Sequence, residues 1–269
     1  MASGAQGKGE LVGLLRQHNV TPSKRFGQNF LVDPNTIRKI VDLAAVGPDD
    51  RVLEVGAGTG TLTRELAKTG AQIVAYEIDP RLQPILEEVM SGIENVELRF
   101  TDAVEAEFEG GPWTVVANLP YNLAATLVLD WLVLPRGPER FVVMVQREVA
   151  DRFAADPGSR VYGLPSVVAR LYGSPRLAFR VSATVFYPQP DVDSAVVEIV
   201  SRTPSEFASA AARLAAAAFG QRRKMLRRSL SDVLADPAAV LSAAGIDPAA
   251  RPEDLTAAQF LSLAEAADG

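Results

Sequence analysis

The sequence contains no cysteine and a single histidine, His18. The lack of cysteine excludes disulfides, thiolate zinc sites, iron–sulfur clusters and cysteine nucleophiles. One histidine cannot form a multi-histidine metal site, and His18 lies far along the chain from the glycine-rich segment described below. We therefore expect neither a histidine triad nor a metal-dependent reaction.

Long apolar segments are also lacking. The longest apolar run, residues 123–134, is interrupted by Asp130 and is too short to cross a bilayer. The N-terminus has no apolar signal segment. We expect a soluble, cytoplasmic protein. Its net charge of −6 argues against indiscriminate binding of polyanions, but it is compatible with a local basic surface.

What the sequence does contain is an alternation of strand and helix patterns. The chain has 269 residues, 48% of them hydrophobic, which suffices for one large domain or for one large and one small domain. Short apolar runs predict strands at residues 51–56, 72–77, 96–100, 113–118 and 141–146, with helices between them. This alternation indicates a parallel sheet covered on both faces.

Glycine or polar residues stand at the carboxyl ends of four of these predicted strands. They are Gly56, Glu77, Asp102 and Asn118. In such folds, ligands bind beyond the carboxyl ends of the strands, near the point where the strand order switches. We therefore expect these four residues to lie on one rim of the sheet and to form one site.

The pattern changes in the last third of the chain. Strands predicted at 177–181 and 194–200 leave no room for a helix between them, so we expect an antiparallel pair that closes the sheet. From Ser205 the sequence becomes alanine-rich and helical. We predict an N-terminal extension (1–20), a catalytic α/β domain (21–203) and a small helical domain (204–269).

The glycine-rich segment, residues 56–60 (GAGTG), follows the first predicted strand. Its glycines let the backbone approach a ligand closely at a helix N-terminus. The third glycine comes one residue too early for the dinucleotide fingerprint, which would have glycine or alanine where Thr61 stands. This spacing disfavours a nicotinamide cofactor.

The two acids at strand ends fit a nucleoside. Glu77 lies 21 residues beyond Gly56, a position that suits hydrogen bonds to two ribose hydroxyls. Asp102 can accept a hydrogen bond from an adenine amino group. The structural alternatives are an exposed acid ending a strand for Glu77 and a helix or loop cap for Asp102.

The segment Asn118-Leu119-Pro120-Tyr121 combines groups that suit a planar ring with an exocyclic amine. Asn118 offers an amide, and Leu119 offers a carbonyl that precedes a proline and so does not continue a regular ladder. Tyr121 offers a flat face on which a base can stack. The structural alternative is a tight strand-to-helix turn with Asn122 as the N-cap.

Together with the strand-end acids, these residues resemble an S-adenosylmethionine-dependent amino-methyltransferase that acts on adenine. The resemblance is closest to the small-subunit ribosomal RNA adenine dimethyltransferase family, the kasugamycin-sensitivity methyltransferases, and it runs from about residue 21 to 234. The segments that carry it are QNFL (28–31), EVGAGTG (54–60), NLPY (118–121), VFYPQPDVDSAV (185–196) and FGQRRK (219–224).

This resemblance implies a Rossmann-like class I methyltransferase fold with a mostly parallel, seven-stranded sheet and a small, all-helical C-terminal domain. The implied reaction is dimethylation of the N6 amines of two adjacent adenosines near the 3′ end of 16S rRNA, late in small-subunit biogenesis. The implied cofactor is S-adenosylmethionine. The residues expected to contact it are Asn29, Leu31, Gly56, Glu77, Asp102 and Asn118.

In the expected reaction, Asn118 and the Leu119 carbonyl, fixed before Pro120, accept the two hydrogens of the adenine amine. Tyr121 is expected to stack on the base, and Phe186, from the loop before the last strand, is a second candidate for stacking. Ordinary core packing is the alternative for Phe186.

A basic run stands out in the helical domain: Arg222, Arg223, Lys224, Arg227 and Arg228. On a single helix, Leu226, Leu230 and Val233 would share an apolar face, and the basic residues would form an outer strip suited to a phosphate backbone. A solvated helix face is the alternative. We expect this strip to bind 16S rRNA within the immature small subunit, and we expect a monomer.

Two other functions remain open at the level of sequence. One is a large-subunit rRNA adenine methyltransferase of the macrolide-resistance type, against which the 186–194 block and the helical tail argue. The other is a chiefly non-catalytic assembly factor that inspects immature small subunits with the same surface.

Overall fold

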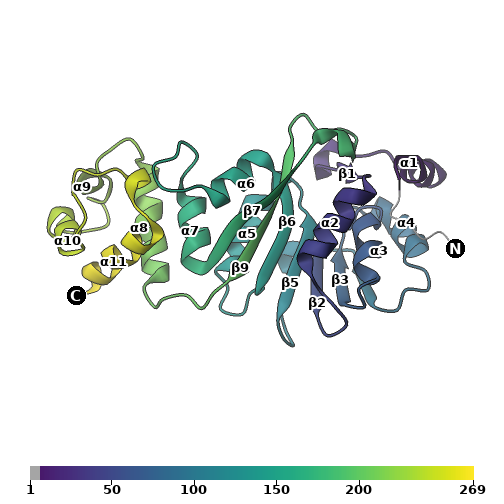
Figure 1. The fold of residues 1–269 in the computed structure, drawn as a ribbon, viewed down its shortest axis with the longest axis horizontal. Helices are drawn as coiled ribbons and strands as arrows, with labels where there is room; N and C mark the ends of the chain where they lie inside the picture. Colours follow the sequence, from purple (N-terminus) through teal and green to yellow (C-terminus); the bar gives the residue numbers. More distant parts are fainter. Residues whose placement is uncertain (1–6) are drawn as a thin grey trace. The chain divides into compact units, whose positions relative to one another are not determined.

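The computed structural model describes residues 7–269, which form two compact units (Figure 1). The first unit runs to Ala150 and also includes residues 177–198. The second unit comprises residues 151–176 and 199–269. It thus contains residues 151–176 and 199–203 in addition to residues 204–269, which were predicted as the helical domain. Residues 1–6 of the predicted N-terminal extension lie outside the described residues.

A seven-stranded sheet forms the centre of the α/β fold, with the order β4-β3-β2-β5-β6-β9-β7. The strands are β2 (Arg51–Val55), β3 (Gln72–Tyr76), β4 (Val96–Arg99), β5 (Trp113–Asn118), β6 (Arg140–Gln146), β7 (Gly173–Val181) and β9 (Ser194–Ser201). The pairs β2–β3, β2–β5, β3–β4 and β5–β6 are parallel. The predicted seven-stranded, mostly parallel sheet is therefore confirmed.

The strand order switches at β2. The chain runs outward from β2 through β3 to β4 and then returns to place β5 on the other side of β2. In the register, Leu53 of β2 is the partner of both Val74 of β3 and Val115 of β5. Segments that follow β2 and β5 diverge at such a point, and the crevice between them is where ligands of this fold bind.

Helices accompany the strands of the first unit. They are α1 (Lys8–Gln17), α2 (Pro34–Ala44), α3 (Thr61–Ala67), α4 (Gln83–Val89), α5 (Ala124–Leu132) and α6 (Arg147–Ala154), the last of which continues into the second unit. At α2, Oδ2 of Asp33 accepts a hydrogen bond from the N–H of Thr36 at 2.8 Å, and Pro34 occupies the first helical position. The start of α2 is therefore fixed by residues next to it in the sequence.

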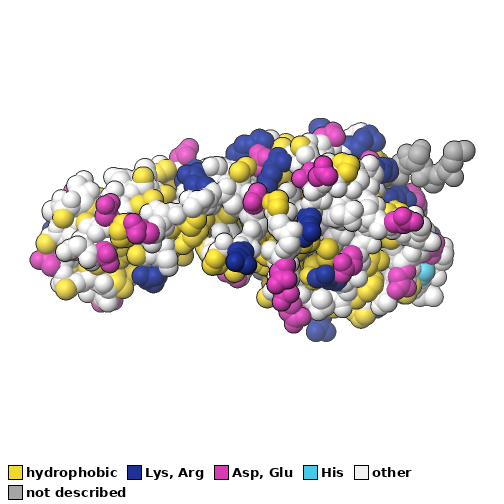
Figure 2. All heavy atoms as spheres, turned by 90° about the horizontal axis from the view of Figure 1, so that it is seen from below, with side chains coloured by type: hydrophobic (Ala, Val, Ile, Leu, Met, Phe, Trp, Pro, Cys, Tyr) yellow, Lys and Arg dark blue, Asp and Glu magenta, His cyan; other side chains and the backbone are white. Residues whose placement is uncertain are grey.

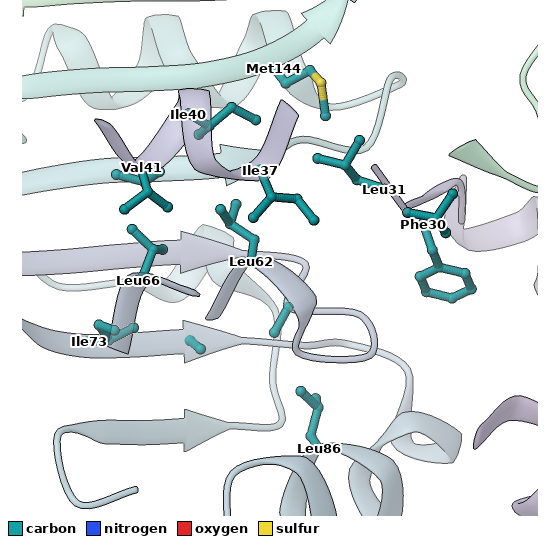
Figure 3. Packing of buried hydrophobic residues seen from close by; sticks show 14 of the residues in the cluster. Phe30, Leu31, Ile37, Ile40, Val41, Leu62, Leu66, Ile73, Leu86 and Met144 are labelled. Carbon is teal, nitrogen blue, oxygen red and sulfur yellow. The ribbon is translucent and has the colours of Figure 1, made fainter. Parts of the chain in front are cut away.

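Apolar residues of α2 and α3 anchor these helices on the sheet (Figure 3). Ile37 and Ile40 of α2, Leu66 of α3 and Ile73 of β3 are buried in one hydrophobic cluster. Burying a side chain of this size contributes about 1.5–3 kcal/mol. This packing fixes α3, and with it the glycine-rich segment that precedes it.

The segment between α1 and α2 is an ordered loop. It contains the short 3₁₀ helix η1 (Lys24–Phe26) and the strand β1 (Phe30–Leu31). Strand β1 pairs antiparallel with β8 (Phe186–Tyr187), so that Leu31 is opposite Phe186. Two distant parts of the chain are joined in this way beside the carboxyl edge of the sheet. Three further 3₁₀ helices of this unit are η2 (Pro80–Leu82), η3 (Ala103–Glu105) and η4 (Ala183–Val185).

The second unit is helical. It contains α7 (Leu164–Tyr172), α8 (Ala208–Gly220), α9 (Leu226–Ser229), α10 (Pro237–Ala243), η5 (Pro252–Asp254) and α11 (Ala257–Asp268). Helix α8 packs on α7 and α11, and the Phe219 ring lies between Tyr162 and Phe260, with ring centroids 6.0 and 6.2 Å away. Helix α7 was not predicted, because it runs straight into β7 without an intervening turn. Between residues 7 and 269, no helix has the length and apolar character needed to span a membrane.

Candidate active site

A pocket lies in the first unit, beyond the carboxyl ends of β2, β3 and β5. Its wall brings together most of the residues predicted from the sequence: Asn29, Gly56, Glu77, Asp102, Asn118, Leu119, Pro120 and Tyr121. These residues come from the β1 loop and from the ends of four strands. The strand-order switch therefore places them on one rim, as the alternation of strands and helices predicts.

The glycine-rich segment turns sharply to reach this pocket. The N–H groups of Gly56 and Ala57 both donate to the carbonyl of Tyr76, at 2.8 and 3.0 Å. Gly58 has a φ of +63°, and a Cβ added there would lie 3.1 Å from the Phe30 ring. Only glycine fits this position without moving Phe30, which is itself part of the pocket wall.

Glu77 is buried at the pocket, with 6% of its surface exposed. Its Oε2 accepts from the N–H of Gly58 at 2.8 Å, and its Oε1 accepts from the N–H of Asp79 at 2.9 Å. Burial raises the pKa of Glu77, while these two hydrogen bonds act in the opposite direction. Each oxygen keeps a further lone pair for a ligand hydroxyl, so the carboxyl group fits a ribose with two hydroxyls.

Asp102 serves as a cap and also lines the pocket. Its Oδ1 accepts from the N–H of Val104 at 3.0 Å and begins η3. Because the cap uses one oxygen, the second can accept a hydrogen bond from an amino group such as that of adenine. The two interpretations of Asp102 left open by the sequence are therefore compatible.

Asn118 ends β5 with its amide oriented by the loop before β1. Its Nδ2 donates to the carbonyl of Asn29 at 3.1 Å, which leaves Oδ1 as the acceptor that this side chain can offer. The N–H of Leu119 donates to the carbonyl of Met144 at 3.0 Å and ties the segment to β6. Asn122 makes no side-chain cap, since α5 begins after Leu123. The turn-and-cap alternative is therefore wrong for Asn122.

Tyr121 is half-buried in the pocket wall and is held by its hydroxyl. That hydroxyl lies 2.8 Å from Oγ of Ser194. Burial raises the pKa of Tyr121 despite this hydrogen bond, so the phenol stays neutral at physiological pH. A ring anchored at its far end presents a fixed face to the pocket.

Leu31 and Phe186 are the two predicted site residues of this unit that do not line the pocket. Leu31 is 5% exposed and Phe186 is 3% exposed, and both belong to the hydrophobic cluster. Figure 3 shows Leu31 beside Ile37 and Met144, with the Phe30 ring directed away from them. The structure places Phe186 in the core and does not bring its ring to the pocket.

Several pocket residues were missed in the sequence. Ile78, Val104 and Leu123 line the pocket and are 49%, 61% and 42% exposed. Ile78 and Val104 stand one and two residues after predicted strand-end acids, which is the signal that could have found them. Leu123 stands two residues after Tyr121. They form an apolar rim that suits a flat ring. Gln28 also lines the pocket and was missed as a functional residue.

The basic residues belong to the second unit and do not form one helix. Helix α9 covers only Leu226–Ser229, and Val233, expected on its buried face, is 51% exposed. Arg222 is half-buried, and its guanidinium donates to the carbonyl of Arg160 at 3.2 Å and lies 3.6 Å from Glu253. The exposed basic side chains are Arg223, Lys224, Arg227 and Arg228. The predicted single helix is therefore wrong, although Leu226 and Leu230 are buried as expected.

The fold and the pocket define a class I S-adenosylmethionine-dependent methyltransferase. Four features of the pocket fit the nucleoside of that cofactor: the glycine-rich segment, the buried Glu77 carboxyl, Asp102 and the apolar rim. A family model described as ribosomal RNA adenine dimethylase matches residues 19–268. The chain belongs to the ribosomal RNA adenine dimethylase family.

Individual relatives agree with this assignment. "Ribosomal RNA small subunit methyltransferase A" of Phenylobacterium zucineum is 44% identical over 259 residues, covering 94% of this chain and 90% of the relative. The protein of the same name from Streptomyces avermitilis is 44% identical over 260 residues, covering 91% and 88%.

Solved structures are also similar. The 23S rRNA methyltransferase ErmE has a TM-score of 0.71 at 30% identity, covering 90% of this chain and all of that chain. A dimethyladenosine transferase from Plasmodium falciparum has a TM-score of 0.76 at 24% identity, covering 87% and 95%, and it supports the fold.

Proposed function

We propose that this protein transfers methyl groups from S-adenosylmethionine to the N6 amines of two adjacent adenosines near the 3′ end of 16S rRNA. We place this activity in the cytoplasm, on the immature small ribosomal subunit, and we propose that the enzyme acts as a monomer. Family membership and relatives named for the small subunit support the choice of RNA. The observation that carries the chemistry is the Asn118 amide, whose nitrogen is bound to Asn29 so that its oxygen is the available acceptor.

The target amine is a weak nucleophile, because its lone pair is delocalised into the adenine ring. Asn118 Oδ1 and the Leu119 carbonyl would accept its two hydrogens and favour a pyramidal nitrogen whose lone pair is free to attack. S-adenosylmethionine, when bound, supplies a methyl group that is already electrophilic on its sulfonium. The protein therefore contributes orientation and preorganised acceptors rather than a strong base.

Tyr121 would hold the flipped adenine by stacking. Extrusion of a base from its helix costs a few kcal/mol, and stacking on an aromatic face offsets about 1–3 kcal/mol per base. The hydrogen bond between the hydroxyls of Tyr121 and Ser194 keeps the ring in place before the base arrives. Glu77 and Asp102 would hold the ribose and the adenine of the cofactor, and the apolar rim of Ile78 and Val104 would flank that adenine.

Incubation of immature small subunits with radiolabelled cofactor, followed by mapping of the labelled nucleotides, tests this function. We expect label on two neighbouring adenosines of 16S rRNA and none on purified large subunits. The comparison with large subunits is needed because ErmE, a 23S rRNA methyltransferase, is similar over 90% of this chain. Label on 23S rRNA alone would replace the proposal with the large-subunit activity.

A further inference from the structure

One wall of the cofactor pocket is a loop that side chains from distant strands hold in place. Residues 26–30 of this loop line the pocket. Asn118 holds the carbonyl of Asn29, as described above. A second bond joins Nε2 of Gln28 to Oδ2 of Asp79 at 2.7 Å. The proposed reaction gives Asn118 a role but none to Gln28 or Asp79.

Asp79 is fully buried, although it carries a carboxylate. The Arg81 guanidinium donates to it twice, from Nε at 2.9 Å and from Nη2 at 2.6 Å, and the Arg81 N–H donates at 3.1 Å. Its own backbone N–H donates to Oε1 of Glu77 at 2.9 Å. Asp79 therefore touches both the loop, through Gln28, and the carboxyl group that is expected to hold the ribose. A buried carboxylate is costly unless every such partner is present.

The Gln28 amide can make these contacts in only one orientation. Its Oε1 accepts from the N–H of Ser23 at 2.7 Å while its Nε2 donates to Asp79. Rotation of the amide by half a turn would place Nε2 against an N–H and Oε1 against a carboxylate. The chain of bonds from Ser23 through Gln28 to Asp79 therefore has a defined direction.

We propose that Gln28 and Asp79 are positioning residues that clasp the loop of residues 23–30 over the bound cofactor and orient Glu77 beneath it. Opening the loop to exchange the cofactor requires breaking this bond and exposing a buried carboxylate. The clasp therefore sets the affinity and the residence time of the cofactor, while the groups around the target amine set the rate of transfer. The inference rests on the cofactor pocket of the proposed function and is independent of the RNA substrate.

Two substitutions of Gln28 test the clasp. Gln28→Glu places a second carboxylate against Asp79, so we expect the dissociation constant for S-adenosylhomocysteine, measured by calorimetry, to rise about tenfold or more. Gln28→Leu removes the bonds to Asp79 and to Ser23 without adding a charge, so we expect a smaller rise.

A matched control is available on α4. Nε2 of Gln83 donates to Glu87 at 2.8 Å on the surface, so Gln83→Glu makes the same chemical change away from the pocket. We expect unchanged cofactor affinity. Hydrogen exchange at residues 23–30 should be faster in Gln28→Glu and Gln28→Leu than in Gln83→Glu.

The clasp is wrong if Gln28→Glu or Gln28→Leu folds and binds the cofactor like the unaltered protein. Thermal unfolding identifies a variant that fails to fold, and in that case the other variant must lower the affinity for the proposal to stand. If the unaltered protein itself does not bind the cofactor, both the clasp and the proposed methyl transfer are overturned.

Discussion

At the scale of single residues, the amide of Asn118 has two distinct contributions. Its nitrogen is bound to the Asn29 carbonyl, and its oxygen remains for the substrate. The side chain therefore joins the loop that lines the pocket to the acceptor expected to hold the target amine. The sequence predicts the position of Asn118 at a strand end, but only the structure shows which end of the amide is free.

Replacing Asn118 by alanine removes that acceptor. We expect Asn118→Ala to lower the single-turnover rate of methyl transfer by about a hundredfold or more, the effect typical of a lost preorganised group at a reacting centre. Cofactor affinity should change by less than about threefold, because the Gln28–Asp79 bond still holds the loop. Asn122→Ala, at an exposed neighbouring amide, serves as the control and should transfer normally. Unchanged turnover in Asn118→Ala would remove Asn118 from its proposed role.

Aromatic residues show where residue-level prediction fails. Tyr121 follows a predicted strand and Phe186 precedes one, and both stand in segments typical of the family. Tyr121 nevertheless lines the pocket, whereas Phe186 is 3% exposed in the core. An aromatic ring satisfies either environment, so its type alone cannot decide between them. The pairing of β1 with β8 makes the decision, since it turns Phe186 inward opposite Leu31.

At the scale of elements, the basic segment after α8 (residues 222–228) consists of a turn and the start of the short helix α9. Leu226 and Leu230 are fully buried four residues apart and fix the short helix α9. The N–H groups of Leu226 and Arg227 are bound to the carbonyls of Ala250 and Pro248. These anchors hold the exposed arginines on a rigid support. The sequence predicted the anchors because they follow helical spacing, but it overestimated the length of the helix.

Neutralising the exposed basic residues should weaken binding to the immature small subunit. We expect Arg223→Gln, Lys224→Gln, Arg227→Gln and Arg228→Gln together to lower affinity, and to reduce the slope of log affinity against log salt by roughly 0.7–0.9 for each lost phosphate contact. Filter binding across a salt series measures both quantities.

Two exposed cations elsewhere provide the comparison for this prediction. Lys39→Gln with Arg136→Gln changes the net charge by two, as Arg227→Gln with Arg228→Gln does. The second pair should reduce affinity and salt slope more than the first. Equal effects of the two pairs would show that net charge matters and that the basic segment does not form a specific contact. Arg222 is left out because its guanidinium is bound within the second unit.

At the scale of the whole molecule, acidic side chains outnumber basic ones. The net charge is −6, and basic and acidic side chains are interspersed on the face drawn in Figure 2. This acidic balance fits recognition of a shaped RNA better than binding of any polyanion. One buried acid, however, links the stability of the fold to pH.

Glu54 lies in β2, two residues before the glycine-rich segment. Burial raises its pKa to about 8. The folded protein therefore retains a proton that the unfolded chain, with its ordinary value of 4.5, has released. The stabilisation from this group is complete below about pH 4.5 and is lost as pH rises to about 8, at about 1.4 kcal/mol per pH unit.

Glu54→Gln should remove this dependence, since glutamine keeps the shape and cannot ionise. We expect the variant to gain free energy of unfolding relative to the parent as pH rises from 5 to about 8, as measured by denaturant titration. Burial of Glu77 also raises its pKa, and the charge of Glu77 contributes to the raised pKa of Glu54. The exposed substitution Glu139→Gln is the control. Parallel curves for parent and Glu54→Gln would contradict an uncharged Glu54.

The sequence by itself determined the strands, the helices between them and the chemical groups at the strand ends. These features are local, because hydrophobic period, turn residues and caps act over a few neighbouring positions. Gly56, Glu77 and Asn118 could be assigned to one rim because parallel strands share an edge. The resemblance to a family added what those groups do.

Tertiary structure alone decided how the rim becomes a pocket. The Gln28–Asp79 bond, the orientation of the Asn118 amide and the inward turn of Phe186 each join residues far apart in the chain. Such contacts depend on how strands order themselves and how loops pack, and a pattern read along the chain does not record these distances. Most of the residues at the rim were therefore predictable from local sequence, whereas their geometry was not.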